Sequence, residues 1–315
     1  MNISPLFSQR HHPIVIDAAG NANGIGLSDY LHQHAETVKD WQLQHGGVLF
    51  RGFPVTGAED FDACAHALQA QPFDYVGGNS PRSRVSKNVY TSTEYPASEV
   101  ISLHNEMSYL PAWPRRLLFH SVLPATSGGQ TSLAHSADVL RAMPQDIVER
   151  FRQKKIRYLR NFPSGLKIGK SWQSTYQTEE RTEAEDIVTQ QGSTCTWLPD
   201  GSLQVQTCCA ATATHPVTGQ EVWFNQAEQW HPSALQPELR ALFEGKSLLA
   251  HDCQYGDGDP LEEDVLATIR KVINANKLLF DWKKGDVLVV DNLLMMHGRE
   301  SFKGARKTLA FLSAT

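Results

Sequence analysis

Residues 284–309 read KGDVLVVDNLLMMHGRESFKGARKTL, and this stretch lies at the centre of the chain's strongest strand signals. Val287–Val290 is an unbroken apolar run, which predicts a buried strand. Thr308–Leu312 is a second apolar run that predicts another strand near the end of the chain. His297 follows the first of these runs closely, where a position on the rim of a sheet is expected.

The rest of the chain alternates further apolar runs with helical patterns. Val48–Phe50 and Leu117–Val122 read as buried strands, and Gly46-Gly47 predicts a helix end. Pro144 is expected to break a helix between Ala137 and Lys154. Other strands are expected at 101–104, 131–134, 156–158, 203–206 and 221–224, and other helices at 29–45, at 61–69 and starting at 259–262. There is no regular βαβ alternation and no Gly-rich dinucleotide loop, so the pattern predicts a mainly β, double-layered antiparallel fold with helical insertions.

Composition restricts the classes of protein that the chain can represent. It has 315 residues, of which 41% are hydrophobic and 20% charged, as in ordinary globular proteins. The formal net charge of -5 and the lack of a basic run argue against nucleic acid as a partner. No apolar run reaches the roughly 18 residues of a membrane span, and none at the N-terminus resembles a signal peptide. We expect one domain over residues 1–315.

The cysteines indicate a reducing compartment. There are five, an odd number, and none has CxxC spacing. This pattern argues against a disulfide framework and against a structural zinc site. We therefore expect reduced thiols and a cytoplasmic protein.

The sharpest local feature is His104-Asn105-Glu106. In a strand, residues two apart share a face, so His104 and Glu106 can offer an imidazole nitrogen and a carboxylate oxygen to one ion. A third ligand must come from elsewhere in the chain, and His297 is the best candidate. Two histidines and one carboxylate that leave other positions open are typical of non-haem iron(II) oxygenases. A zinc site would more often use three tight ligands and one water.

Several segments together resemble the taurine dioxygenase (TauD/TfdA) family of iron(II)- and 2-oxoglutarate-dependent oxygenases. The likeness runs in order from about Gly47 to the C-terminus, and it is similar to the branch that includes the syringomycin-biosynthesis aspartyl hydroxylase. The segments that carry it are Tyr90–Pro96, LHNEMSY at 103–109, WPRRLLFHSVLPATSGGQT at 113–131, WFNQAEQWH at 223–231, YGDGDPL at 255–261 and the stretch at 284–309.

The resemblance implies a double-stranded β-helix, or jelly roll, of the clavaminate synthase-like type. It also implies iron(II) as cofactor, with 2-oxoglutarate and O2 as co-substrates, and it matches His104, Glu106 and His297 to the iron ligands. Taurine dioxygenase has Asp at the middle position, whereas Glu106 is one methylene longer and can still ligate. Retention of a carboxylate argues against a halogenase.

The 2-oxoglutarate site also follows from the resemblance. Thr131 matches the family threonine that binds 2-oxoglutarate, and Arg306 matches the arginine that pairs with its distal carboxylate. A guanidinium suits this role because it can form two parallel charge-assisted hydrogen bonds to a carboxylate. Arg299 is the competing choice, with a salt bridge to Glu300 or Asp291 as its other interpretation.

Substrate contacts are predicted less directly. The candidates for the pocket wall are Asn105, Ser108, Tyr109, Arg160, Trp223 and Asn225. Asn105 points away from its neighbours if the strand is regular and would then support the site, and Trp223 can equally be a core aromatic. His215, His231 and His251 could each mimic a ligand, although turn residues beside the first two favour loop roles. An insertion around 160–200, rich in polar residues, is expected to cover the substrate.

These features predict a dioxygenase that hydroxylates an unactivated C–H bond of an amino acid, free or tethered to a peptidyl carrier protein, in antibiotic or toxin biosynthesis. The same chemistry on a small sulfonate or carboxylate such as taurine is the alternative. A non-catalytic β-barrel binding protein and a zinc hydrolase are rivals from other classes. A free anionic substrate predicts an additional arginine in the pocket, and a carrier-bound one predicts a wide approach. Assembly into a homo-oligomer is left open.

Overall fold

The computed structural model describes all residues except 9, 11, 20–23, 81, 93, 165–169, 237, 239 and 242–248. Part of the insertion expected at 160–200, residues 165–169, therefore lies outside the described residues. The larger of the two central sheets has the strand order β1-β2-β3-β16-β6-β19-β4, and only the β2–β3 pair is parallel. Its strands are β1 (Asn2–Pro5), β2 (Ile14–Asp17), β3 (Gly47–Arg51), β16 (Val287–Asp291), β6 (Arg116–Leu123), β19 (Lys307–Ser313) and β4 (Tyr90–Thr91).

Strand β16 shows why residues 287–290 are apolar at every position. It lies between β3 and β6, so both of its faces are covered. Leu288 and Val290 face one apolar cluster, whereas Val287 and Val289 belong to another. This alternation follows from the two-residue period of a strand. The second cluster includes Leu31 of helix α1 (Leu27–Gln33) and Phe61 of helix α3 (Ala58–Ala67), which therefore cover one face of the sheet.

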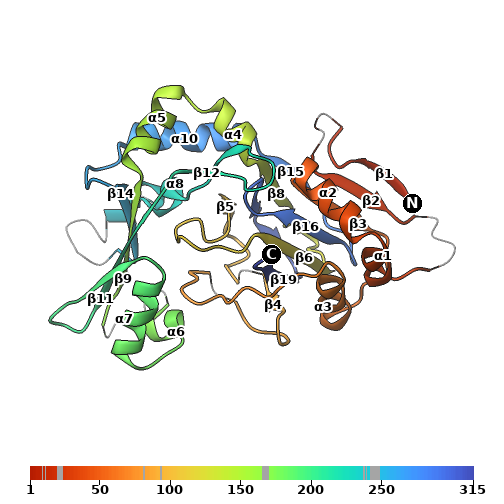
Figure 1. Cartoon of the computed structure of the whole chain (residues 1–315), viewed down its shortest axis with the longest axis horizontal. Coiled ribbons are helices and arrows are strands. Elements are labelled where there is room, and N and C mark those ends of the chain that lie inside the picture. The colour runs from red at the N-terminus through yellow and green to blue at the C-terminus, as the bar shows by residue number, and fades with distance from the viewer. Residues whose placement is uncertain are drawn as a thin grey trace.

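The other face of the large sheet packs on a second, four-stranded sheet of order β15-β8-β17-β5. The shared cluster includes Leu117 and Leu288 from the large sheet and Leu103 and Leu133 from the small one. Figure 1 shows these strands at the centre of the molecule, with the C-terminus among them. Two facing sheets, antiparallel except for the β2–β3 pair, form the predicted jelly roll. The small sheet consists of β15 (Leu278–Phe280), β8 (Thr131–His135), β17 (Met295–Arg299) and β5 (Ile101–His104).

A third sheet, of order β10-β11-β9-β14, lies on the side of the molecule away from β1–β3 (Figure 1). Its strands are β10 (Thr194–Trp197), β11 (Leu203–Cys209), β9 (Ile156–Phe162) and β14 (His251–Tyr255). Helices α6 (Trp172–Tyr176) and α7 (Arg181–Gln190) pack against it through a separate apolar cluster. The remaining pairs are β12 (Thr212–Thr214) with β13 (Glu221–Trp223), and β18 (Phe302–Lys303) with β7 (Ser127–Gly128).

The helix predictions hold with corrections at the ends. The expected helix at 29–45 is two helices, α1 and α2 (Ala35–His45), and Gly46 ends the second with a left-handed φ of 69°. Pro144 separates α4 (Ser136–Ala142) from α5 (Gln145–Lys154), as predicted. The helix start predicted at 259–262 was wrong, because α10 (Glu263–Ala275) begins later. Asp259 forms an ion pair with Lys154 and does not cap the helix. The other short helices are α8 (Ala227–Trp230) and the 3-10 turn η1 (Pro232–Ala234).

All five cysteines are free thiols, as expected. Among the described residues, no helix has the length and apolar character needed to cross a bilayer.

Candidate metal centre and cavity

His104 and His297 are brought together by strand pairing. They are directly opposite partners on the neighbouring strands β5 and β17, and their ring centroids are 4.4 Å apart. Opposite residues in an antiparallel pair project from the same face, so both imidazoles point into the space between the sheets. The sheet register alone therefore unites two ligand candidates that are far apart in sequence.

Glu106 reaches the same point by a different route from the one predicted. The expected strand ends at His104, so strand alternation does not orient Glu106. Asn292, which follows β16, accepts a hydrogen bond from the Glu106 amide at 2.7 Å and donates to the Glu106 carbonyl at 2.9 Å. The next residue, Met107, adopts a left-handed φ of 57°. A turn held by a buried asparagine therefore positions the carboxylate.

The three side chains can share one metal ion. Glu106 Oε2 is 4.0 Å from His104 Nε2 and 3.8 Å from His297 Nε2, and all three ligand atoms lie within 4.8 Å of one another. His104 Nδ1 lies 2.9 Å from the Ser102 carbonyl. That contact requires a proton on Nδ1 and leaves the Nε2 lone pair free for a metal.

The protonation states also fit metal binding. Burial lowers the pKa of His104 below its usual value, and burial with the nearby His104 and Arg82 lowers the pKa of His297 well below it. Both imidazoles are therefore neutral near pH 7, which is the form that ligates metals. Two neutral imidazoles and one carboxylate form a donor set that suits iron(II) and leaves other coordination positions free.

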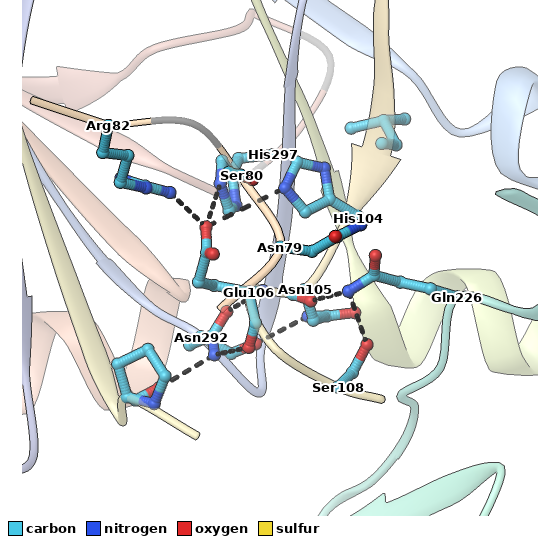
Figure 2. A network of polar contacts seen from close by, with 12 residues as sticks. Asn79, Ser80, Arg82, His104, Asn105, Glu106, Ser108, Gln226, Asn292 and His297 are labelled. Atoms are coloured by element: carbon cyan, nitrogen blue, oxygen red, sulfur yellow. Dashed lines mark hydrogen bonds and ion pairs between the residues drawn. The ribbon is translucent and has the colours of Figure 1, made fainter. Parts of the chain in front are cut away.

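Arg82 and Tyr75 hold the carboxylate of Glu106, and no sequence motif marked either residue. Arg82 Nη2 donates to Glu106 Oε2 at 2.6 Å, and Tyr75 Oη donates to Oε1 at 3.2 Å. The Arg82 and Glu106 side chains are each only 3% exposed. Figure 2 shows Arg82 approaching the carboxylate while His104 and His297 lie close to the same oxygen.

The described residues include one other group with metal-ligand chemistry, formed by His12, His135 and Asp138. His12 Nε2 is 3.0 Å from Asp138 Oδ2. Arg10 and Arg141 also contact the Asp138 carboxylate, at 3.5 and 2.7 Å. With two guanidinium groups on its only carboxylate, this group is better suited to an ion-pair network than to a dication.

Thr131 and Arg306 border a small cavity beside His104 and His297. Arg306 has no carboxylate partner among the described residues and stacks on Phe302. Burial, together with the charge of Arg299, lowers the pKa of Arg306 to about 10, so it remains cationic near neutral pH. A half-buried guanidinium without a carboxylate partner is suited to an anionic group. Thr131 Oγ1 accepts a hydrogen bond from Trp282 Nε1 at 2.8 Å.

Arg299 borders the same small cavity but is already engaged. Its guanidinium donates to the carbonyls of Tyr95, Pro96 and Glu99, at 3.3, 2.8 and 2.7 Å. The salt bridge considered for Arg299 does not form. Glu300 pairs with Lys277 at 3.0 Å, and Asp291 pairs with His215 at 3.0 Å.

A much larger cavity, of about 510 Å³, opens beside the ligand group. His104 and Glu106 border it, as does Tyr109. On the other side its wall includes Glu228 of α8 and Arg270 of α10. A cavity of this size suits a small organic molecule held next to the metal ligands.

The remaining predicted substrate residues lie behind this wall. Asn105 donates to Ser136 Oγ. It also donates to the Asn292 carbonyl, and Ser108 accepts from Gln226, which itself borders the cavity (Figure 2). Trp223 is fully buried against Phe151. Asn225 donates to the Ala211 carbonyl. Arg160 donates to the Gly77 carbonyl, and its guanidinium lies over the Tyr109 ring.

The histidines that could mimic a ligand have other contacts. His231 accepts from the Ser233 amide, whereas His251 borders the cavity and contacts Asn79.

The insertion expected at 160–200 touches the rim of the cavity. Within its described part, Arg160 and Lys170 donate to the carbonyls of Gly77 and Gly78. The next two residues, Asn79 and Ser80, border the cavity. The insertion therefore braces the loop that forms part of the cavity wall.

Comparison with known proteins relates the whole chain to one family. The family described as "Taurine catabolism dioxygenase TauD, TfdA family" matches residues 9–312. Dapdiamide synthesis protein DdaC from Enterobacter agglomerans is 34% identical over 308 residues, covering 97% of this chain and 92% of that protein. A clavaminate synthase-like protein from Arabidopsis thaliana is 30% identical over 282 residues, covering 85% and 82%. The crystal structure of PvcB from Pseudomonas aeruginosa superposes with a TM-score of 0.58 at 16% identity, over 99% of this chain and 90% of that one.

The fold and the site thus define a jelly-roll oxygenase of the iron- and 2-oxoglutarate-dependent class. The chain belongs to the TauD/TfdA family. It is a 2-oxoglutarate-dependent dioxygenase, with iron(II) as cofactor and 2-oxoglutarate and O2 as co-substrates.

Proposed function

We propose that this dioxygenase hydroxylates an unactivated C–H bond of an amino acid, free or tethered to a carrier protein, in a secondary-metabolite pathway. The relative named for dapdiamide synthesis supports the pathway class, at 34% identity over nearly the whole chain. The observation that carries the substrate class is the cavity of about 510 Å³, which places charged groups of both signs, Glu228 and Arg270, in one space with His104 and Glu106.

We assign His104, Glu106 and His297 as the iron ligands, and Thr131 with Arg306 as the 2-oxoglutarate site. The close approach of the three ligand atoms supports the first assignment. The half-buried guanidinium of Arg306, which has no carboxylate partner among the described residues, supports the second. Arg299 is the weaker choice because three backbone carbonyls already occupy it.

The residues of this chain bind and orient the co-substrate and the substrate, and they exclude water from the site. Bound iron(II) would supply the oxidising chemistry with O2 as the oxidant: one oxygen atom would enter the substrate C–H bond, and the other would enter succinate as 2-oxoglutarate loses CO2. Arg306 orients the co-substrate through its distal carboxylate, and Arg82 and Tyr75 hold the Glu106 carboxylate in place. The wall formed by Tyr109, Gln226 and Trp230 fixes which C–H bond faces the metal ligands.

The first test is the anaerobic visible spectrum of the protein with iron(II) and 2-oxoglutarate, followed by a substrate screen. Free amino acids and the same amino acids loaded on a peptidyl carrier protein are assayed for succinate formation and for a product heavier by one oxygen atom. Amino-acid-dependent succinate with a hydroxylated product supports the proposal. If neither form is turned over while the spectral band is present, the amino-acid assignment is wrong.

The rival substrate class is a small sulfonate such as taurine, which should be included in the same screen. A sulfonate, like an amino acid, carries an anionic group that Arg270 could bind. Turnover in the screen therefore decides between the two substrate classes. A non-catalytic binding protein would give no succinate with any member of the panel. We also propose that the chain works in the cytoplasm as one domain, with residues 160–200 covering the substrate. The contacts of Arg160 and Lys170 with the cavity rim support that cover.

A further inference from the structure

Glu228 is a buried carboxylate that the metal centre does not use. Its side chain is 7% exposed, and it borders the large cavity. Its nearest cation is Arg270, with Nε 3.5 Å from Oε2. That separation is longer than the roughly 2.7–2.9 Å of a charge-assisted hydrogen bond, and contacts with Arg270 and the Gln229 side chain offset the effect of burial only in part. A buried charge without full pairing is costly, which points to a missing partner.

Arg270 is fixed in place but not saturated. Its Nε and Nη2 donate to the Glu228 carbonyl at 3.1 and 2.6 Å, and Nη2 also donates to Ser233 Oγ at 2.8 Å. Within the described part of the chain, Nη1 makes no hydrogen bond. The three bonds hold the guanidinium rigidly at the cavity wall, with one edge free to donate to a ligand.

We infer that Glu228 and Arg270 together recognise the zwitterionic head of a free α-amino acid, with the ammonium group at Glu228 and the carboxylate at Arg270. This inference rests on the proposed function and narrows it. A carrier-bound aminoacyl thioester has no α-carboxylate for Arg270 to meet. The two charges lie side by side in the cavity, as do the ammonium and carboxylate of an amino acid.

The charges around Glu228 make the inference testable by pH. Burial raises the pKa of Glu228 to about 7, although Arg270 opposes this increase. Tyr158 of β9 and Cys253 of β14 also face it, and their pKa values are raised well above the usual range. His251 of β14 has a pKa lowered to about 3. Between pH 6 and 8.5, Glu228 is therefore the group of this set that changes charge.

Because an ammonium group favours the ionised carboxylate, amino-acid affinity should rise as pH increases through about 7 and then level off. Below pH 7 the affinity should fall by up to about tenfold per pH unit. The wild-type protein, loaded anaerobically with iron(II) and 2-oxoglutarate, is titrated calorimetrically with each of the common L-amino acids. The tightest binder is then compared with its 2-hydroxy acid, which lacks the ammonium group, and with its N-acetylcysteamine thioester, which lacks the free α-carboxylate.

In Glu228→Gln we expect the dissociation constant for the amino acid to rise about 10- to 100-fold, the usual effect of losing a hydrogen bond to a charged group, and the pH dependence to flatten. The 2-hydroxy acid should bind the wild type and the variant equally. Glu263→Gln is the matched control, since Glu263 lies on the same helix as Arg270 but pairs with Arg240 and does not border the cavity. An unchanged 2-oxoglutarate band in Glu228→Gln verifies that the variant is folded.

The inference is overturned if Glu228→Gln binds the amino acid as tightly as the wild type, or if it loses affinity for the 2-hydroxy acid to the same extent. It is also overturned, with the proposed function intact, if only carrier-tethered amino acids bind and turn over. The proposed function itself fails only if neither free nor tethered amino acids are substrates.

Discussion

Asn292 pairs with the main chain of Glu106 in the way that a neighbouring strand would. Its side-chain oxygen accepts from the Glu106 amide at 2.7 Å, and its nitrogen donates to the Glu106 carbonyl at 2.9 Å. The same nitrogen donates to the Pro114 carbonyl at 2.8 Å, and the residue is fully buried. One side chain thus fixes the turn that carries the carboxylate of the metal site.

Replacement of Asn292 by Ala should destabilise the fold and loosen the metal site together. Loss of the side chain leaves buried backbone groups of Glu106 and Pro114 unpaired, at about 1–3 kcal/mol for each such group. Metal affinity should fall about 10- to 100-fold, as for other residues that orient ligands. Chemical denaturation and a metal titration measure the two effects. Normal metal affinity in a destabilised variant would show that Asn292 supports the fold alone.

His297→Ala should abolish the visible band of the iron(II)–2-oxoglutarate complex. It removes one of three proposed ligands, so metal affinity should fall by more than the roughly 10–100-fold typical of residues behind the ligands. The measurement is anaerobic absorbance at saturating 2-oxoglutarate. His231→Ala is the control, since His231 contacts Ser233 outside the ligand group. A wild-type band in His297→Ala would remove this residue from the site.

Replacement of Arg306 should weaken co-substrate binding, whereas replacement of Arg299 should lower stability. Arg306→Ala removes the unpaired guanidinium, so we expect about 10- to 100-fold weaker 2-oxoglutarate binding, equal to the loss of a charge-assisted hydrogen bond, with little change in unfolding. Arg299→Ala should instead lower stability by about 1–3 kcal/mol, because three carbonyls lose their donor. Titration of the visible band and thermal unfolding distinguish the two. The opposite pattern would reassign the co-substrate arginine to Arg299.

Arg82→Gln should make the protein more dependent on metal. In the metal-free protein Arg82 neutralises the buried Glu106 carboxylate, and breaking such a pair typically costs about 3–5 kcal/mol. A bound dication supplies the same compensation. Unfolding temperatures with and without Mn(II) should therefore differ more in the variant than in the wild type. Equal metal-induced shifts would show that Arg82 does not compensate this carboxylate.

Glu228 should reduce stability at alkaline pH. Its folded-state pKa of about 7 lies above the usual value of 4.5, so the folded state favours the protonated form. The stability this contributes is fully present below about pH 4.5 and is lost as pH rises through about 7. Glu228→Gln should therefore match the wild type near pH 4.5 and exceed it by about 2–3 kcal/mol at pH 8.5. Denaturation curves at both pH values test this, and a variant less stable than the wild type at pH 8.5 would contradict it.

Much of the fold could be predicted from local pattern. The apolar run at 287–290 gives a strand covered on both faces because each residue must meet one of two apolar clusters. Gly46 and Pro144 end helices because their backbones permit or forbid particular conformations. The metal-ligand candidates were found through motif resemblance, and the pairing of His104 with His297 follows from sheet register.

The sequence by itself therefore determined the mainly β fold, the family and the residues able to ligate metal, because these depend on short-range periodicity and on motifs. Only the tertiary structure decided that Asn292, 186 positions away, holds Glu106 off its strand, and that Arg82 neutralises that carboxylate. It also decided that Glu228 and Arg270, 42 positions apart, share a cavity with the metal ligands. Such contacts join residues with no common period in sequence, so they exist only once the sheets and helices have packed.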